Sequence, residues 1–171
     1  VRGLAAIIGR GAKIGGDFSL RGSSCKVLYL NEVVIEGTAY FNGMGAMTDE
    51  GRANGQAQKP SIVIEEADLT GIQMKEGEFY GMRARNISLQ NGLVRRNLNL
   101  RRTYFGRVNM AGLTVGTTLL LEDAVIEGCE DVTGLVVSAY SLNERTRIPA
   151  DLKRALQGYK RLDSRETYTI H

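Results

Sequence analysis

The chain has 171 residues, of which 43% are hydrophobic and 24% are charged, with 22 Lys and Arg against 19 Asp and Glu. This composition excludes a disordered or collagen-like chain, and the length favours one domain with a real hydrophobic core. No apolar run approaches the ~20 residues of a membrane-spanning helix, and the stretch Leu4–Ile8 is shorter than the ~7-residue minimum for the core of a signal peptide.

Side chains suited to catalysis are scarce. The single histidine, His171, is the last residue, which removes most Ser-His-Asp hydrolase sites and most zinc sites. The two cysteines, Cys25 and Cys129, give no disulfide framework, which is compatible with a reducing, cytoplasmic compartment. The sequence therefore leans away from an enzyme and predicts no metal and no cofactor. Because it begins at Val1, we expect it to be a fragment of a longer protein.

Glycine is frequent, with 21 residues or about 12% of the chain against a usual ~7%, and apolar residues recur at intervals of five. The series is Leu69, Met74, Phe79, Ala84, Leu89 and Val94, then, after one step of six, Leu100, Phe105, Met110, Val115, Leu120 and Val125. At a 43% background, twelve apolar residues in a fixed register arise by chance about 4 times in 100,000. The same step connects Leu20, Cys25, Leu30 and Ile35 with Phe41 six on, and Ile126 with Val132 six on, Val137 and Leu142.

A strict interval of five excludes a helix, in which neighbouring side chains recur at three and four. Alternate members of the series instead end an apolar, polar, apolar triplet such as Ile87-Ser88-Leu89, which is the alternation of a short strand with one buried face. A turn former follows each triplet within a few residues. The pattern therefore predicts a chain that turns a corner every five residues, closes a coil in about 20 or 21, and stacks its coils at about 4.8 Å.

These residues resemble the pentapeptide-repeat family, whose loose consensus is a small residue, Asp or Asn, Leu and two polar residues. Ala67-Asp68-Leu69-Thr70-Gly71 fits it closely, and the resemblance covers most of residues 12–142, although few second positions hold Asp or Asn. It implies an all-β solenoid, a right-handed quadrilateral parallel β-helix. A left-handed β-helix of hexapeptides competes, because Ile8-Gly9 and Ile14-Gly15 lie six residues apart, but this step ends after Leu20.

We expect the solenoid to occupy residues 1–142 and to be broken by residues 42–60, which are polar and glycine-rich. This segment predicts a surface loop, either a mobile excursion or a loop that binds a partner or ligand. Before residue 12, the stretch Leu4–Ile8 either plugs the end of the solenoid or follows further protein.

The C-terminal residues 143–171 predict a different structure. Residues 148–159 have the pattern of a short α-helix, with Pro149 in its first turn and an apolar face that includes Leu152 and Leu156. A solenoid leaves an open core and an unpaired strand edge at its last coil. We therefore expect a capping helix, with a partner-binding helix as the alternative.

Charge is segregated along the chain. Residues 61–78 hold five acids and one lysine, residues 79–121 hold seven arginines and no other charged residue, and residues 122–131 hold five acids and no base. The arginines are Arg83, Arg85, Arg95, Arg96, Arg101, Arg102 and Arg107. Because coils stack in sequence order, we expect a cationic band between two acidic bands. Arg83, Arg85 and Arg107 are predicted to share one face, and the other four lie around a different corner.

The arginines form either an ordinary solvated surface or a surface for an anionic partner, and a preference for Arg over Lys favours directed contacts to carboxylate or phosphate. Nucleic acid binding is disfavoured, because aromatic interleaving is missing and the acidic bands would repel a long polyanion. The DNA mimicry known in part of the pentapeptide-repeat family is disfavoured too, because a mimic needs an extended acidic face.

The remaining reactive side chains favour structural roles. Cys25 occupies a central repeat position, so we expect it in the core. Cys129 is predicted to fall off the core register, among acids that would raise its pKa. A cluster of acids is of the type that binds a hard cation such as calcium, although a solvated acidic edge is favoured. The cluster is Glu122, Asp123, Glu127, Glu130 and Asp131.

Three functions are consistent with these patterns. The first is a non-enzymatic protein-interaction or scaffolding module, as part of a larger bacterial protein such as a secreted effector. The second is a carbohydrate-binding or carbohydrate-active β-helix, which requires a groove with two or more carboxylates on adjacent coils beside residues 42–60. The third is a structural element that self-associates end to end, favoured by an uncapped N-terminal coil and opposed by the C-terminal helix. Fold alone does not choose among them.

Overall fold

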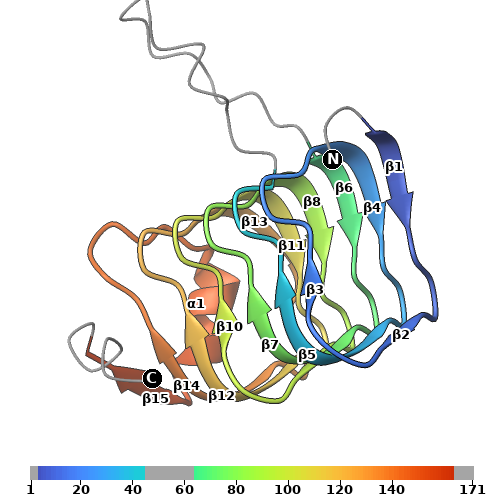
Figure 1. Ribbon diagram of the computed structural model, residues 1–171. Coiled ribbons are helices and arrows are strands. Elements are labelled where there is room, and N and C mark those ends of the chain that lie inside the picture. The colour runs from blue at the N-terminus through green and yellow to red at the C-terminus, as the bar shows by residue number, and fades with distance from the viewer. Residues whose placement is uncertain (1–3, 45–63, 164–171) are drawn as a thin grey trace, which may run out of the picture.

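The computed structural model describes residues 4–44 and 64–163, which form two parallel β-sheets around one core (Figure 1). Sheet A has the strand order β1-β4-β6-β8-β11-β13. Sheet B has the order β2-β5-β7-β10-β12-β14-β15, with β3 paired to β5 and β9 paired to β7 and β12. The strands of sheet A are β1 (Leu4–Ile8), β4 (Cys25–Tyr29), β6 (Ile64–Asp68), β8 (Arg83–Ser88), β11 (Tyr104–Asn109) and β13 (Val125–Asp131). The strands of sheet B are β2 (Lys13–Ile14), β3 (Phe18–Ser19), β5 (Val34–Tyr40), β7 (Gln73–Glu78), β9 (Leu93–Val94), β10 (Leu98–Asn99), β12 (Thr114–Leu120), β14 (Val136–Ser141) and β15 (Lys160–Leu162).

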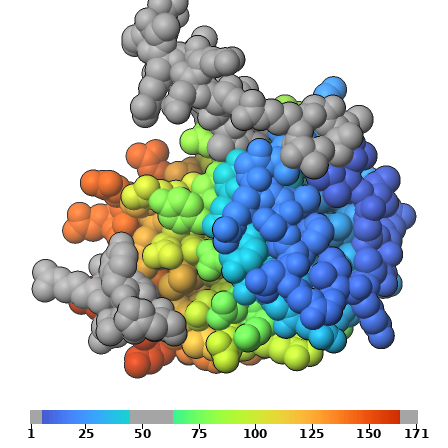
Figure 2. All heavy atoms as spheres, viewed as in Figure 1, coloured from blue at the N-terminus to red at the C-terminus, as the bar shows by residue number. Residues whose placement is uncertain are grey.

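The chain passes alternately through the two sheets, so that each coil adds one level to both. Stacked residues give the coil length: Gln73 pairs with Leu93, 20 residues on, and Leu98 pairs with Leu119, 21 residues on. About seven turns stack in sequence order, and Figure 2 shows them as successive colour bands from one end of the molecule to the other. The predicted right-handed parallel β-helix is confirmed, and the left-handed hexapeptide alternative is wrong.

The core follows the five-residue series over most of its length. All of its members from Leu69 to Val115 are buried, with at most 1% of each residue exposed. The last two members are wrong, because Leu120 and Val125 are only partly buried. Their neighbours Leu121 and Ile126 take the inward positions instead.

This error has a simple geometric cause. One side of the coil is six residues long, from Val94 to Leu100, and the next coil stacks an equal side onto it, from Val115 to Leu121. The extra residue therefore recurs in the following coil, whereas the prediction used it once. The same side also has six residues in the two N-terminal coils, which explains the hexapeptide spacing there.

The corners between the two sheets place one residue each in a left-handed backbone conformation. Among the described residues these are Gly11, Gly22, Glu32, Gly43, Gly71, Gly81, Asn91, Arg102, Gly112, Asp123 and Gly134. Seven of the eleven are glycines, which adopt positive φ without steric cost, so the corners explain much of the glycine content. Side chains close the adjoining turns: Asp68 accepts a hydrogen bond from the Thr70 N–H, and Asn109 accepts one from the Ala111 N–H, each at 3.0 Å.

The N-terminal end is an open coil. Leu4–Ile8 forms β1 and pairs with β4, so it does not plug the end. The inward side chains Ile14 and Phe18 are only partly buried, because no described residue stacks on their outer side. Ile8 is 67% exposed. End-to-end self-association through this coil stays a prediction.

The C-terminal end carries helix α1 (Ala150–Leu156), which follows where the next strand of sheet A begins. Arg147 still pairs with β13 through the backbone of Ile126, and the chain then leaves the sheet. Leu152 and Leu156 are at most 1% exposed and belong to the core, as expected for a cap. The helix is shorter than the predicted 148–159, because Pro149 lies before its first turn and the chain re-enters sheet B as β15, which was not predicted.

The chain departs from the solenoid between Met44 and Ile64. Met44 is buried and its carbonyl accepts a hydrogen bond from the Arg83 N–H at 2.8 Å, while Ile64 pairs with Ala84. The two therefore stand at neighbouring positions on one coil. The loop predicted for residues 42–60 begins too early, since residues 42–44 still belong to the coil; its remainder lies outside the described residues.

Candidate functional site

A groove of about 410 Å³ lies on the outer face of sheet A and crosses β6, β8, β11 and β13. Polar side chains line it almost throughout. They are Glu66, Asp68, Thr70, Asn86, Ser88, Gln90, Arg107, Asn109 and Glu130. The groove starts at β6, the strand that resumes the solenoid after residues 45–63.

Three of these side chains form a column along the solenoid axis. Glu66 pairs with Asn86, and Asn86 pairs with Arg107, so they stand on successive coils at the strand spacing of about 4.8 Å. Glu130 lies one coil further on, where the register of β13 shifts by one residue, and is displaced sideways from the column. The groove therefore has a carboxylate at each end and a guanidinium between them.

Tyr29 on β4 flanks the groove beside Glu66. Its hydroxyl donates a hydrogen bond to Glu66 Oε2 at 3.2 Å, and the Arg10 guanidinium lies 5.3 Å from the centre of its ring. Partial burial and the Glu66 carboxylate raise the pKa of Tyr29. The phenol therefore stays protonated at neutral pH and orients the Glu66 carboxylate.

Part of the groove wall serves the fold. Asp68 accepts the Thr70 N–H, and the hydroxyls of Thr70 and Ser88 lie 2.9 Å apart. Burial raises the pKa of Asp68, but hydrogen bonds from Thr70 and Asn31 outweigh it and hold that pKa below its ordinary value. These side chains close turns, so they form a fixed wall.

The column and Glu130 have no comparable structural task. Asn86, Arg107 and Glu130 are exposed, and Arg107 forms no ion pair with the described residues. Of this set the sequence predicted Arg107 as part of a partner surface and Glu130 as part of an acidic cluster. It missed Glu66 and Asn86, although the intervals of 20 and 21 residues that separate Glu66, Asn86 and Arg107 equal the coil length.

The seven arginines do not share one surface. Arg83, Arg85 and Arg107 lie on sheet A, whereas the other four lie in and after the bend between β9 and β10 on sheet B. Two of the latter are paired with acids of adjacent coils: Arg96 lies 3.8 Å from Glu76 and Arg102 lies 3.7 Å from Asp123.

Two further arginine contacts hold neighbouring side chains on sheet B. Arg101 Nε donates to Asn99 Oδ1 at 3.0 Å, and the Arg102 guanidinium lies 5.5 Å from the ring centre of Tyr80. Acidic and aromatic neighbours therefore occupy much of this part of the cationic band. Binding of an anionic partner by the seven arginines stays a proposal.

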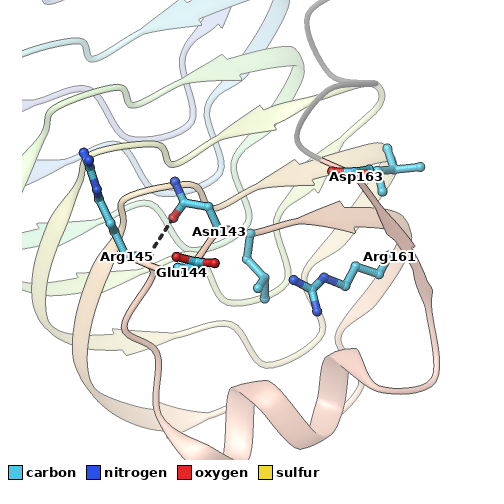
Figure 3. Close-up of a pocket in the computed structure, with 7 residues that line it drawn as sticks. Asn143, Glu144, Arg145, Arg161 and Asp163 are labelled. Carbon is cyan, nitrogen blue, oxygen red and sulfur yellow. Dashed lines mark hydrogen bonds between the residues drawn. The ribbon is translucent and has the colours of Figure 1, made fainter.

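A larger basin of about 710 Å³ opens at the C-terminal end (Figure 3). It lies between residues 142–145 and β15, where α1 has left the coil incomplete. Arg161 extends from β15 into this space, and Asn143 Oδ1 accepts the Arg145 N–H at 3.1 Å. The basin is the unfinished corner of the last coil, so it follows from the end of the stack.

The two cysteines are structural. Cys25 is 2% exposed in the core, as expected. Cys129 does not fall off the core register, because it pairs with the buried Val108 and packs partly against the core. Burial, Asp151 and Asp131 raise its pKa to about 11.

The acidic cluster is spread over separate environments. Asp123 accepts a hydrogen bond from Asn143 Nδ2 at 2.9 Å, and Glu122 is only 8% exposed. A hydrogen bond to Glu127 raises the pKa of Tyr104. In residues 4–44 and 64–163, no three His, Cys, Asp or Glu side chains come together in a way that suits a metal ion.

Comparison with protein-family models, with curated proteins and with solved structures gives no match to this chain. Among the described residues, no helix has the length and apolar character needed to cross a membrane.

Proposed function

We propose that this chain is a non-enzymatic protein-interaction module of the pentapeptide-repeat type, and that its partner binds in the groove of sheet A. The inward five-residue series and the turn-closing side chains Asp68 and Asn109 support the family. The groove supports the function, because four successive strands present polar side chains at a fixed spacing and Asn86, Arg107 and Glu130 have no task in the fold.

The outer face of sheet A changes charge along the solenoid axis. Its charged side chains are Glu65, Glu66 and Asp68 on β6, Arg83 and Arg85 on β8, Arg107 on β11, and Glu127, Glu130 and Asp131 on β13. Such a surface favours a protein segment of mixed charge over a long polyanion, which the two acidic strands repel. The arginines of sheet A then contact acidic groups of that segment.

Selection of random displayed peptides on the immobilised chain tests this function. Asn86→Arg places a long side chain in the middle of the groove, and the matched control Gln73→Arg places the same side chain at an exposed position of sheet B. We expect selected peptides that lose binding to Asn86→Arg and keep binding to Gln73→Arg. A selection without such peptides contradicts the proposal, provided that thermal melts show both variants folded.

Carbohydrate binding is a second candidate, favoured by the amides of Asn86 and Gln90, which both donate and accept hydrogen bonds. The carboxylates that line the groove come from β6 and β13, so two strands separate them and the predicted pair on adjacent coils is not found in it. Binding without catalysis is therefore the form of this hypothesis that we retain. A glycan array with the same two variants separates it from protein binding.

A further inference from the structure

We propose that the groove binds a protein segment in the polyproline II conformation that carries a cation, an anion and a second cation in this order. This inference rests on the proposed function, because it states the chemistry of the partner for the same groove. It follows from the order of charges, from their spacing and from the size of the groove.

The order of charges is set by Glu66, Arg107 and Glu130. Glu66 is oriented by the Tyr29 hydroxyl at 3.2 Å, and Arg107 and Glu130 are exposed. A cation of the partner is attracted at either end of the groove, and an anion is attracted between them. A segment with the opposite order meets three like-charge contacts, so the groove discriminates by repulsion as well as by attraction.

The spacing of these charges matches a polyproline II helix. Glu66 and Arg107 are two strand steps apart, or about 9.6 Å, and Glu130 lies a third step on, at about 14 Å. A polyproline II helix rises about 3.1 Å per residue with three residues per turn, so residues three apart lie on the same side at about 9.3 Å. The next residue is rotated by a third of a turn, in keeping with the sideways displacement of Glu130. The matching pattern is cation, two spacers, anion, cation.

The groove also disfavours the two regular alternatives. An α-helix about 10 Å wide would fill roughly 1,100 Å³ over a 14 Å length, well above the 410 Å³ of the groove. An added β-strand needs a sheet edge, and this groove lies on a sheet face. A polyproline II segment needs no backbone ladder, and the exposed amide of Asn86 can hydrogen-bond to its peptide groups.

Fluorescence anisotropy with labelled synthetic peptides tests the proposal. The probe is Gly-Lys-Pro-Pro-Glu-Lys-Gly, the charge-inverted control is Gly-Glu-Pro-Pro-Lys-Glu-Gly, and a flexible control replaces both prolines with glycine. We expect the probe to bind at least fivefold more tightly than the inverted peptide at low salt, with the difference falling as salt is added. The flexible control should bind more weakly than the probe, because it must be ordered on binding.

Charge reversal in the protein provides the decisive comparison. The triple variant Glu66→Lys/Arg107→Glu/Glu130→Lys should prefer the inverted peptide. Glu36→Lys, which makes the same net change of charge on β5 of sheet B, should keep the wild-type preference. All three groove positions are exposed, so we expect the triple variant to fold, and a thermal melt checks this.

The proposal is overturned if the two charged peptides bind equally, if neither binds at millimolar concentration, or if the triple variant keeps the wild-type preference. Equal binding of the flexible control overturns the polyproline II conformation. Library peptides that depend on Asn86 but lack this order of charges support the proposed function and overturn the present inference. Failure of the library selection itself overturns the function.

Discussion

Gly106 and Arg85 lie on adjacent coils so close together that a methyl group on Gly106 would sit 2.7 Å from the Arg85 carbonyl oxygen. On sheet B, Gly116 approaches the Arg95 carbonyl in the same way. Both arginines belong to the cationic band, and both glycines stand directly above them on the next coil. The backbone of this band is therefore packed as tightly as its side chains are exposed, and substitution of the glycines should affect stability.

Replacement of Gly106 by alanine should lower the free energy of unfolding by about 1–3 kcal/mol, because the backbone of β8 or β11 must shift to admit the methyl group. Gly16→Ala is the control, since a methyl group there meets no atom within 4 Å. Urea denaturation of both variants measures the difference. Equal stability of the two variants would mean that the coils separate easily at this position.

The six-residue side of the coil predicts opposite fates for two adjacent leucines. Leu121 is fully buried, whereas Leu120 is only partly buried. Leu121→Ala should cost about 2–5 kcal/mol of stability, as large-to-small core substitutions do, and Leu120→Ala should cost clearly less. The uninterrupted five-residue series predicts the reverse order, so urea midpoints of the two variants decide between the registers.

Two asparagines that close equivalent turns should differ in their contribution. Asn109 accepts the Ala111 N–H at 3.0 Å, so Asn109→Ala should cost about 1 kcal/mol. Asn99 is 3% exposed, accepts the Arg101 N–H, and donates to Glu78 Oε2 at 2.7 Å. Asn99→Ala should cost about 2–3 kcal/mol, because it also strands buried polar partners. Thermal or urea unfolding compares the two, and similar losses would show that the Glu78 contact adds nothing.

Stability should fall in acid partly through Asp68. Its pKa in the folded state is lowered, because hydrogen bonds from Thr70 and Asn31 outweigh the effect of burial. A lowered folded pKa gives stability that is present above the ordinary carboxyl pKa of about 4 and is lost as the pH falls through the folded value. Asp68→Asn should therefore be less stable than the wild type at pH 7, and the gap should narrow below pH 4. A gap that is constant with pH argues against this role of the carboxylate.

The Cys129 thiol should react slowly with alkylating reagents. Burial, Asp151 and Asp131 raise its pKa to about 11, which reduces the thiolate present at pH 7.5. We expect alkylation by iodoacetamide, followed by peptide mass spectrometry, to be at least tenfold slower than for a free thiol. Asp151→Asn should speed the reaction, and an unchanged rate would leave burial as the sole cause.

The fold was predictable from the sequence because its inward positions recur at nearly constant intervals, as Leu69, Phe79 and Leu89 show. Register errors arose where local spacing was ambiguous, because Leu120 and Leu121 are equally apolar and only the stacking on Leu100 distinguishes them. Cys129 was misplaced for a related reason, since a shift in the register of β13 brings it opposite Val108.

The groove was less predictable than the fold. It depends on outward side chains that belong to different coils, so the exact number of residues per coil must be known before Glu66 and Arg107 can be aligned. The short strand β15 carries no periodic signal of its own. It forms because sheet B offers β14 as a partner after the helix ends.

The neighbouring positions of Met44 and Ile64 bear on how the solenoid assembles. Each coil of a solenoid contacts mainly the coils beside it, so folding propagates from one level to the next. Between these two residues the chain must close a loop of 19 residues instead of a short turn, which costs about 2 kcal/mol more in chain entropy. The stack is therefore least cooperative at this level. Hydrogen exchange should find residues 4–44 opening as a unit before the coils that follow.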